Sequence, residues 1–441
     1  MKGVKTFPRG GIHPHGRKNL TNKKEIVIAD IPETLTVPMA QHLGAPAESV
    51  VAAGDKVKEG MLIGKPTGFI SAAIHSPVSG TVKEITDVYL ANGMKSSAVV
   101  IEKEEGFTPA VKTKSDSWKG KTPQELNDIV KEFGIVGLGG ATFPANVKYM
   151  VPKGEKAEYL IINAVECEPY LSADHRVMLE KAAEIIEGLR IIRKIVGPEK
   201  IAIGIEINKP DAIEIMRRQA EAENFELEVV PLKLKYPQGD EKQLIKAVTG
   251  REVPSGGLPL AVGCVVSNVG TVNAVYEAVV LGKPLYERTV SVTGLGVKNP
   301  GNFLVRVGTP ISKLLEACGG TIDRPAKVVV GGPMMGFSIY DLDTPVTKGT
   351  SGILVLTDKE AGSGARTACL SCGKCVSVCP MGLNPTKMFK FVDHGDYDGA
   401  MATDLMDCKE CGCCAFSCPA NIPLVQGMRL GKKMARKKKV S

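Results

Sequence analysis

The spacing of apolar and polar positions predicts an alternating strand–helix core in the middle of the chain. Residues 122–134 begin with a Thr followed by a Pro and carry acids in the first turn, which is typical of a capped helix. Downstream, apolar strands alternate with amphipathic helices. The strands are expected at 159–170, 200–207 and 225–233, and the helices at 179–197, 211–224 and 239–250. This alternation predicts a doubly wound parallel sheet, whose ligands lie at the carboxyl ends of the strands.

Shorter strands flank this core on both sides. The stretches GDKVKEGMLIG (54–64) and SPVSGTVKEI (76–85) are similar to the two halves of a lipoyl- or biotinyl-type barrel-sandwich hybrid. Carrier domains of that type hold a Lys at the hairpin tip, but 66–77 contains no Lys. We therefore expect a docking or structural module there. After Tyr286, short strands around a helix at 311–320 predict a small β-grasp module.

The chain is therefore expected to be a multidomain α/β protein. The predicted order is an irregular segment (1–24), a barrel-sandwich hybrid (25–105), a linker (106–120), a Rossmann-like nucleotide-binding domain (121–284), a β-grasp, SLBB-like module (285–340), a linker (341–366), an α-helical 2[4Fe–4S] ferredoxin domain (367–428) and a basic tail (429–441).

Most of the 12 cysteines are concentrated near the C-terminus in two groups with the spacing C-x2-C-x2-C-x3-C-P. This spacing is typical of bacterial [4Fe–4S] proteins, in which the fourth Cys of each group binds the other cluster. Zinc ribbons instead use two separated C-x2-C pairs. We assign Cys369, Cys372, Cys375 and Cys418 to one cluster, and Cys408, Cys411, Cys414 and Cys379 to the other. Cys413 would break the spacing.

Composition and charge narrow the location of the protein. No apolar stretch approaches the roughly twenty residues of a spanning helix, and the N-terminus has no apolar signal core, so we expect neither a membrane span nor export. The net charge of +8 falls near +1 without residues 429–441. Nucleic-acid binding is therefore not expected. The tail is either a solvated end or a patch attracted to an anionic membrane surface.

Four loops of the central domain point to a flavin nucleotide. They are GLGGATFP (137–144), NAVECEP (163–169), YPQGDEKQ (236–243) and SNVGTVNA (267–274). A helix N-terminus with small residues can bind phosphate, and glycines let the backbone approach a flat ring. A flavin also exchanges electrons both in pairs and singly, which links a nicotinamide to [4Fe–4S] clusters. A Gly-rich turn that serves only packing remains the alternative.

These loops, in this order, resemble the NADH-binding flavoprotein subunit of respiratory complex I. The whole chain, with FPRGGIHPHGRK (7–18), the lysine-free barrel-sandwich hybrid and both cysteine groups, more closely resembles the RnfC family of the Rnf ion-translocating electron-transport complex. Val165 and Cys167 depart from the Asp and Ser of the complex I loop, and Leu138 stands in place of an Arg.

The resemblance implies roles for particular residues. The residues implied to bind FMN and NADH/NAD+ are Gly137, Gly139, Gly140, Lys148, Asn163, Glu166, Glu168, Tyr236, Gly239, Asp240, Glu241, Ser267, Asn268 and Thr271. The last three would hold the FMN phosphate. No separate catalytic side chain is expected, because the cofactors carry the electrons. Two simpler interpretations stay open. Glu166 and Glu168 precede a helix and could favour its dipole, and Lys148 could be a solvated helix charge.

The expected function is electron entry into an Rnf complex. NADH would be oxidised, or NAD+ reduced, at FMN, and single electrons would pass through two [4Fe–4S] clusters to membrane-embedded and ferredoxin-type partner subunits that translocate Na+ or H+. The expected location is peripheral, on the cytoplasmic side of the bacterial membrane. Two alternatives are a soluble corrinoid reductase of a bacterial microcompartment, with the same cofactors, and a docking protein without a working nucleotide site.

Overall fold

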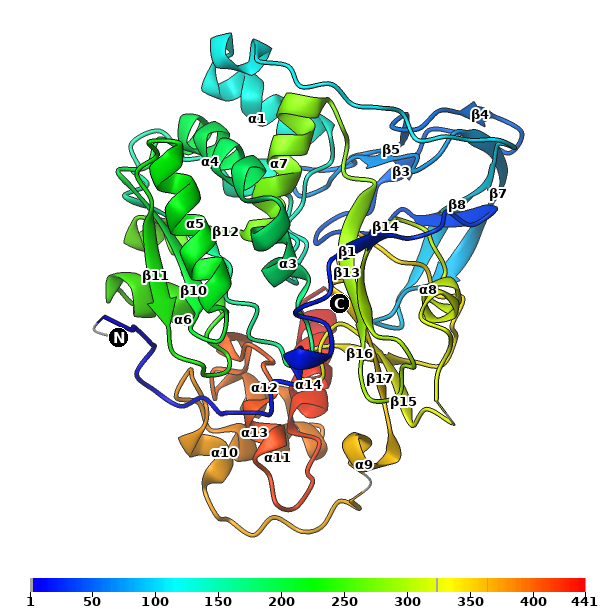
Figure 1. Ribbon diagram of the computed structural model, residues 1–441. Coiled ribbons are helices and arrows are strands. Elements are labelled where there is room, and N and C mark those ends of the chain that lie inside the picture. The colour runs from blue at the N-terminus through cyan, green and yellow to red at the C-terminus, as the bar shows by residue number, and fades with distance from the viewer. Residues whose placement is uncertain (1–2, 323, 363, 441) are drawn as a thin grey trace.

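The computed structural model describes residues 3–322, 324–362 and 364–440 (Figure 1). Its strands form four sheets, and a helical region follows at the C-terminal end. Among the residues described, no helix combines the length and apolar character needed to cross a membrane. The mixed α/β, multidomain architecture expected from the sequence is confirmed.

The central sheet is fully parallel, with the order β11-β10-β9-β12. Leu160 and Ile162 point into the core beneath α4 and α7, whereas Ile161, between them, packs with residues of α6 on the opposite face. This alternation is the period of two expected of a strand covered on both faces. The elements are β9 (Tyr159–Asn163), β10 (Lys200–Glu206), β11 (Glu228–Leu232), β12 (Cys264–Asn268), η2 (Ser117–Gly120), α1 (Pro123–Glu132), α2 (Ala145–Lys148), α3 (Ala173–Glu180), α4 (Ala182–Val196), α5 (Pro210–Ala222), α6 (Glu241–Thr249), η3 (Pro259–Val262) and α7 (Val269–Leu281).

Two small sheets form the barrel-sandwich hybrid near the N-terminus. One has the order β2-β8-β7-β4 and the other β3-β5-β6, and they enclose a core that includes Leu35, Ile63, Ile74 and Ile101. The strands are β2 (Thr34–Pro38), β3 (Glu48–Ser49), β4 (Lys56–Val57), β5 (Leu62–Lys65), β6 (Ile74–His75), β7 (Gly80–Tyr89) and β8 (Lys95–Lys103).

The third unit is a six-stranded sheet with the order β1-β14-β13-β17-β15-β16. Its elements are β1 (Ile26–Ile28), β13 (Glu287–Thr293), β14 (Gly301–Arg306), α8 (Ile311–Ala317), β15 (Lys327–Val330), β16 (Phe337–Ile339) and β17 (Gly352–Leu356). Two expectations need correction here. The stretch 341–366 is not only a linker, because the buried strand β17 lies between β13 and β15. Residues 26–28 pair with β14 rather than with the barrel-sandwich hybrid.

The C-terminal region is helical, as expected. Its elements are α9 (Asp358–Ala361), α10 (Lys374–Ser377), α11 (Pro385–Asp393), α12 (Tyr397–Met401), η4 (Leu405–Asp407), α13 (Cys413–Phe416) and α14 (Leu424–Val440). The basic tail is not a separate frayed segment, because α14 runs through it. Lys432 is 8% exposed and donates hydrogen bonds to the Cys408 carbonyl and to Glu410.

The first residues form a strap along the bottom of the central sheet (Figure 1). Lys5 pairs with Leu232 at the end of β11, and Ile12 pairs with Tyr236. The Gly11 amide then donates to the carbonyl of Val378 in the cluster region. The strap ends in the short η1 (Lys18–Leu20), so one segment touches both the nucleotide-binding fold and the cysteine-rich region.

Candidate functional site

A cavity of about 690 Å³ opens at the carboxyl ends of β9 and β12. Every residue predicted to bind FMN or NADH lines it, from the Gly loop, the acidic loop, the loop before α6 and the start of α7. These segments come from distant parts of the sequence, and the parallel sheet brings them to one edge. The arrangement makes one large nucleotide-sized site of four separate motifs.

The Gly loop leaves the cavity open to a flat ligand. A Cβ on Gly139 would lie 3.1 Å from Asn268 Cβ, whereas a Cβ on Gly140 would meet nothing within 4 Å. Gly140 adopts φ of +135°, which side chains rarely tolerate. The loop therefore combines close packing against β12 with an uncovered backbone surface, which fits the wall that a flavin ring requires.

The acidic loop presents Glu166 to the cavity. Its Oε1 accepts a hydrogen bond from the Asp174 amide in the first turn of α3, so the helix-capping role considered from the sequence is present. Its Oε2 is buried without a hydrogen-bond partner among the described residues and lies 3.8 Å from Lys18 Nζ. Burial and the charge of Glu166 raise the pKa of Asp174. The loop thus holds concentrated negative charge beside an unsatisfied oxygen, which suits a ligand that donates hydrogen bonds.

Glu168 bonds to a loop that no sequence motif connects to the site. Its carboxylate accepts hydrogen bonds from the amides of Met334 and Met335, at 3.1 and 3.0 Å. A Cβ on Gly332 would collide with it. Burial raises the pKa of Glu168 to about 7, and the two amides oppose that shift. Glu168 therefore joins the acidic loop to the GGPMMG segment (331–336) of the six-stranded sheet.

Lys148 and Glu241 face each other across the cavity. The ammonium donates to Glu241 Oε1 at 2.7 Å, and each side chain remains about one-third exposed. Lys148 is therefore a paired cation in the cavity wall rather than a freely solvated helix charge. Nearby, Asp240 caps α6 by accepting from the Gln243 amide, and Asn163 donates to the Gly239 carbonyl.

The predicted phosphate loop is internally capped. Asn268 Oδ1 accepts from the amides of Gly270 and Thr271, while its Nδ2 donates to Asp174. Ser267 Oγ is 2.8 Å from the hydroxyl of Tyr149, a buried residue that no motif marks. A phosphate would use these amides only by replacing the Asn268 side chain, so the capped start of α7 is the least open part of the site.

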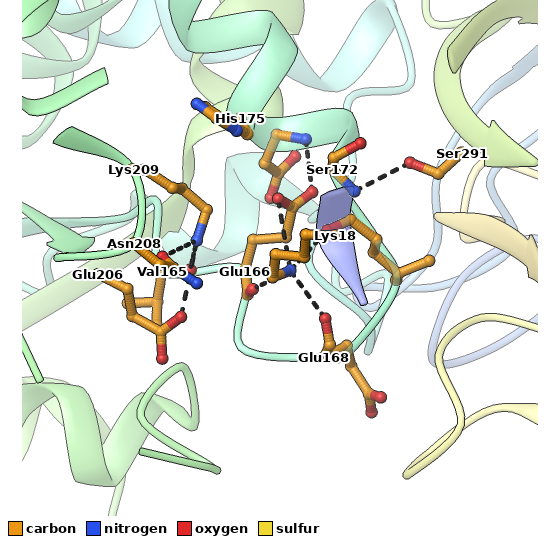
Figure 2. A network of polar contacts seen from close by, with 12 residues as sticks. Lys18, Val165, Glu166, Glu168, Ser172, His175, Glu206, Asn208, Lys209 and Ser291 are labelled. Carbon is orange, nitrogen blue, oxygen red and sulfur yellow. Dashed lines mark hydrogen bonds and ion pairs between the residues drawn. The ribbon is translucent and has the colours of Figure 1, made fainter. Parts of the chain in front are cut away.

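Several further residues complete the cavity. Gln41, His42, Leu90 and Asn92 come from the barrel-sandwich hybrid, and Phe337 comes from the six-stranded sheet. No motif marks them, because only the packing of separate modules brings them to the cavity. Two buried cations support its walls from behind, Lys18 (Figure 2) and Arg288, which donates to the Leu138 carbonyl.

The eight predicted cluster cysteines fall into two separate cavities. Cys369, Cys372, Cys375 and Cys418 line one of about 150 Å³. Cys379, Cys408, Cys411 and Cys414 line a narrower one of about 20 Å³, together with Cys413. Each cavity takes its fourth cysteine from the other sequence group, which is the crossover that the spacing predicts. In the described ranges, no three His, Cys, Asp or Glu side chains are gathered so as to hold a metal ion as they stand.

Comparison with protein families assigns all four regions. The matching family models are the RnfC barrel sandwich hybrid domain (residues 5–106), the Nuo51 FMN-binding domain (130–277), the SLBB domain (289–338) and the 4Fe-4S dicluster domain (368–422). These matches agree in kind and order with the modules expected from the sequence.

Curated relatives match along most of the chain. The RnfC component of the proton-translocating ferredoxin:NAD(+) oxidoreductase complex of Clostridium ljungdahlii is 46% identical over 87% of this chain and 84% of the relative. The corresponding component of the Na(+)-translocating complex of Acetobacterium woodii is 42% identical over 96% of both. That of the ion-translocating oxidoreductase complex of Rhodobacter capsulatus is 41% identical over 96% of this chain and 82% of the relative.

One solved structure supports the fold alone. An NAD+-reducing [NiFe]-hydrogenase in its H2-reduced state is 18% identical, with a TM-score of 0.50, and the match covers 73% of this chain. This chain spans 62% of that hydrogenase chain.

Proposed function

This chain belongs to the RnfC family of Rnf complex subunits, and from that premise we propose that it passes electrons between NADH or NAD+ and two [4Fe–4S] clusters through FMN. It is an oxidoreductase component of a multi-subunit, ion-translocating complex. The relatives translocate protons or Na+, and we assign that step to membrane-embedded partner subunits. A microcompartment corrinoid reductase receives no support from these relatives.

One observation carries the proposal. Cys411 lines both the nucleotide cavity and the narrower cysteine cavity. A cluster held by Cys379, Cys408, Cys411 and Cys414 would therefore share a wall with the flavin site. When bound, FMN accepts a hydride from NADH and releases electrons singly, and [4Fe–4S] clusters carry single electrons.

The two cysteine groups differ in exposure in a way that suggests their order. Cys414 and Cys379 are 8% exposed, whereas Cys369 and Cys372 are exposed at the surface. We assign the Cys408 group to the cluster next to the flavin and the Cys369 group to the cluster that meets partner subunits. Lys374, Lys387 and Lys390 are exposed near the second of these, so an acidic, ferredoxin-type surface suits that exit.

The residues of the chain bind and orient the two nucleotides. The Gly loop supplies a flat wall, the start of α7 supplies phosphate-binding amides, and Glu166 offers a buried acceptor oxygen. Lys148 lies within reach of anionic ligand groups if its bond to Glu241 is broken. The modules that surround the cavity shield it from water, which strengthens each of these polar contacts.

Location follows from the same proposal. We place the protein on the cytoplasmic side of the bacterial membrane, attached through partner subunits. The exposed cations Lys433, Arg436 and Lys437 on α14 add attraction to anionic lipid.

An anaerobic NADH titration of the flavin- and cluster-reconstituted chain tests the central step. We expect NADH to bleach the flavin absorption first and the cluster absorption afterwards. Bound flavin that NADH does not bleach would overturn the NADH step and leave a relay fed by another donor. Failure to bind FMN at all would overturn the nucleotide site.

A further inference from the structure

Lys18 is a buried cation that the function proposed above does not yet use. It ends the FPRGGIHPHGRK motif, and its side chain is 10% exposed. Its Nζ donates to the carbonyls of Glu166, Glu168 and Leu171, at 2.7, 2.9 and 2.5 Å (Figure 2). An ammonium has three donors, so the acidic loop occupies all of them.

These three carbonyls span six residues of a strained loop. Glu166 and Tyr170 adopt positive φ of 46° and 69°, a conformation that costs free energy for residues other than glycine. The strap adds a backbone contact, because the Tyr170 amide donates to the Gly16 carbonyl at 2.6 Å. The loop therefore keeps this shape only while contacts outside it compensate for the strain.

A second lysine holds the same loop in a different way. Lys209 donates to the Val165 carbonyl from the other end of the loop, and its charge lies 3.6 Å from the equally buried Glu206 (Figure 2). Within the described part of the chain, Lys18 makes no hydrogen bond to a carboxylate. Its nearest carboxylate oxygen is Glu166 Oε2 at 3.8 Å, the same oxygen that lacks a hydrogen-bond partner there. The charge of Lys18 is thus committed to the acidic loop alone.

We propose that Lys18 is a positioning residue of the nucleotide site. By gathering the three carbonyls it fixes the acidic loop, and its charge keeps Glu166 in place as the acceptor of a bound pyridine nucleotide. The N-terminal strap is then a part of the NADH site that the central domain alone does not contain. This inference rests on the proposed function.

The test compares Lys18→Met with Lys24→Met in the full, FMN-loaded chain. Lys24 is a lysine of the same segment whose ammonium donates to the Pro300 carbonyl, at a distance from the acidic loop. Stopped-flow reduction of bound flavin, followed against NADH concentration, separates apparent NADH affinity from the limiting rate. Loss of hydrogen bonds from a charged donor predicts an apparent Kd raised about tenfold or more in K18M, with K24M unchanged. Lys18→Arg, which retains the charge, should recover part of that loss.

An NADH affinity in K18M equal to that of the unaltered chain would overturn the proposal. So would a K18M chain that loses flavin and clusters together while the flavin that remains binds NADH normally, because that pattern describes a structural role only. If the unaltered chain is not reduced by NADH, the proposed function fails instead.

Hydrogen exchange decides the case in which K18M does not fold. In the unaltered chain, before and after addition of NAD+, we expect residues 163–171 and 10–20 to exchange as one unit, with protection rising in both. Protection that rises in the acidic loop while the strap is unaffected would overturn the role of Lys18.

Discussion

The hydroxyl of Tyr236 donates a 2.7 Å hydrogen bond to the carbonyl of Cys411. Tyr236 is 2% exposed, lines the nucleotide cavity, and packs with Ile12 and Cys413 in one small apolar cluster. The same hydroxyl lies 3.5 Å from Glu168 Oε1. One buried side chain therefore connects the acidic loop to the backbone of a predicted cluster ligand.

Replacing Tyr236 with Phe should slow electron passage from flavin to cluster and leave flavin reduction by NADH nearly unchanged. The substitution removes a hydrogen bond whose net value is about 1 kcal/mol, so the Cys411 loop gains freedom and the second step slows by about fivefold. Stopped-flow absorption resolves the flavin and cluster phases.

Tyr149→Phe is the matched control, because its hydroxyl contacts Ser267 at the phosphate end of the cavity. We expect Y149F to weaken FMN binding and to leave the cluster phase intact. Equal slowing of both phases in Y236F would contradict the connecting role of Tyr236.

Adjacent cysteines in the second group should behave oppositely. Cys414→Ala should remove one cluster and about half of the iron, because a [4Fe–4S] cluster requires four thiolates. Cys413→Ala should retain both clusters, since its thiol is fully buried against the Tyr236 carbonyl. Iron and acid-labile sulfide analysis of the two purified variants checks this. Normal iron content in C414A, or loss of iron in C413A alone, would reverse the assignment.

The sequence predicts what depends on local spacing. The parallel sheet and the helices around it follow from periodicity, and the capping box of Thr122 and Glu125 is present at α1. The loops carrying Gly139, Glu166 and Asn268 meet at one cavity because parallel strands present their carboxyl ends on the same edge. Motif order alone was enough for that part of the site.

Contacts between modules were not predictable in this way. Lys18, Arg288 and Met335 reach the site through packing of segments more than a hundred residues apart in sequence. The strand β17 was missed because Gly352–Leu356 is a short apolar run without alternation, flanked by turn residues. The length of α14 was missed because a run of basic residues was interpreted as solvated, whereas Lys432 binds the Cys408 carbonyl.

Lys348 should make stability depend on pH. It is 1% exposed, and its ammonium donates to the carbonyls of Ala73 in the barrel-sandwich hybrid and Gly134 in the central domain, both at 2.7 Å. Burial lowers the pKa of Lys348 to about 7, against about 10.4 in an unfolded chain. Between these values the unfolded state binds more protons, so stability rises with pH from about 7 to about 10 and the gain is lost as pH falls through about 7.

Melting temperatures measured across that range check this expectation. Lys348→Met should flatten the rise, while an exposed lysine such as Lys58→Met should retain it. An unchanged slope in K348M would show that other groups carry the pH dependence.

The exposed cations of α14 should bind anionic membranes. Lys433, Arg436 and Lys437 are exposed, whereas Lys432 is committed to Cys408 and Glu410. At about 1 kcal/mol for each basic residue near an anionic surface, changing these three to Gln should weaken binding to phosphatidylserine vesicles by about a hundredfold. Co-sedimentation at low salt measures the loss, and high salt should abolish binding of the unaltered chain because screening shortens the electrostatic range. Three exposed lysines elsewhere, changed together as K58Q/K83Q/K153Q, keep the net charge of the variant equal. If that control loses as much binding, the attraction depends on net charge alone and α14 is not the membrane contact.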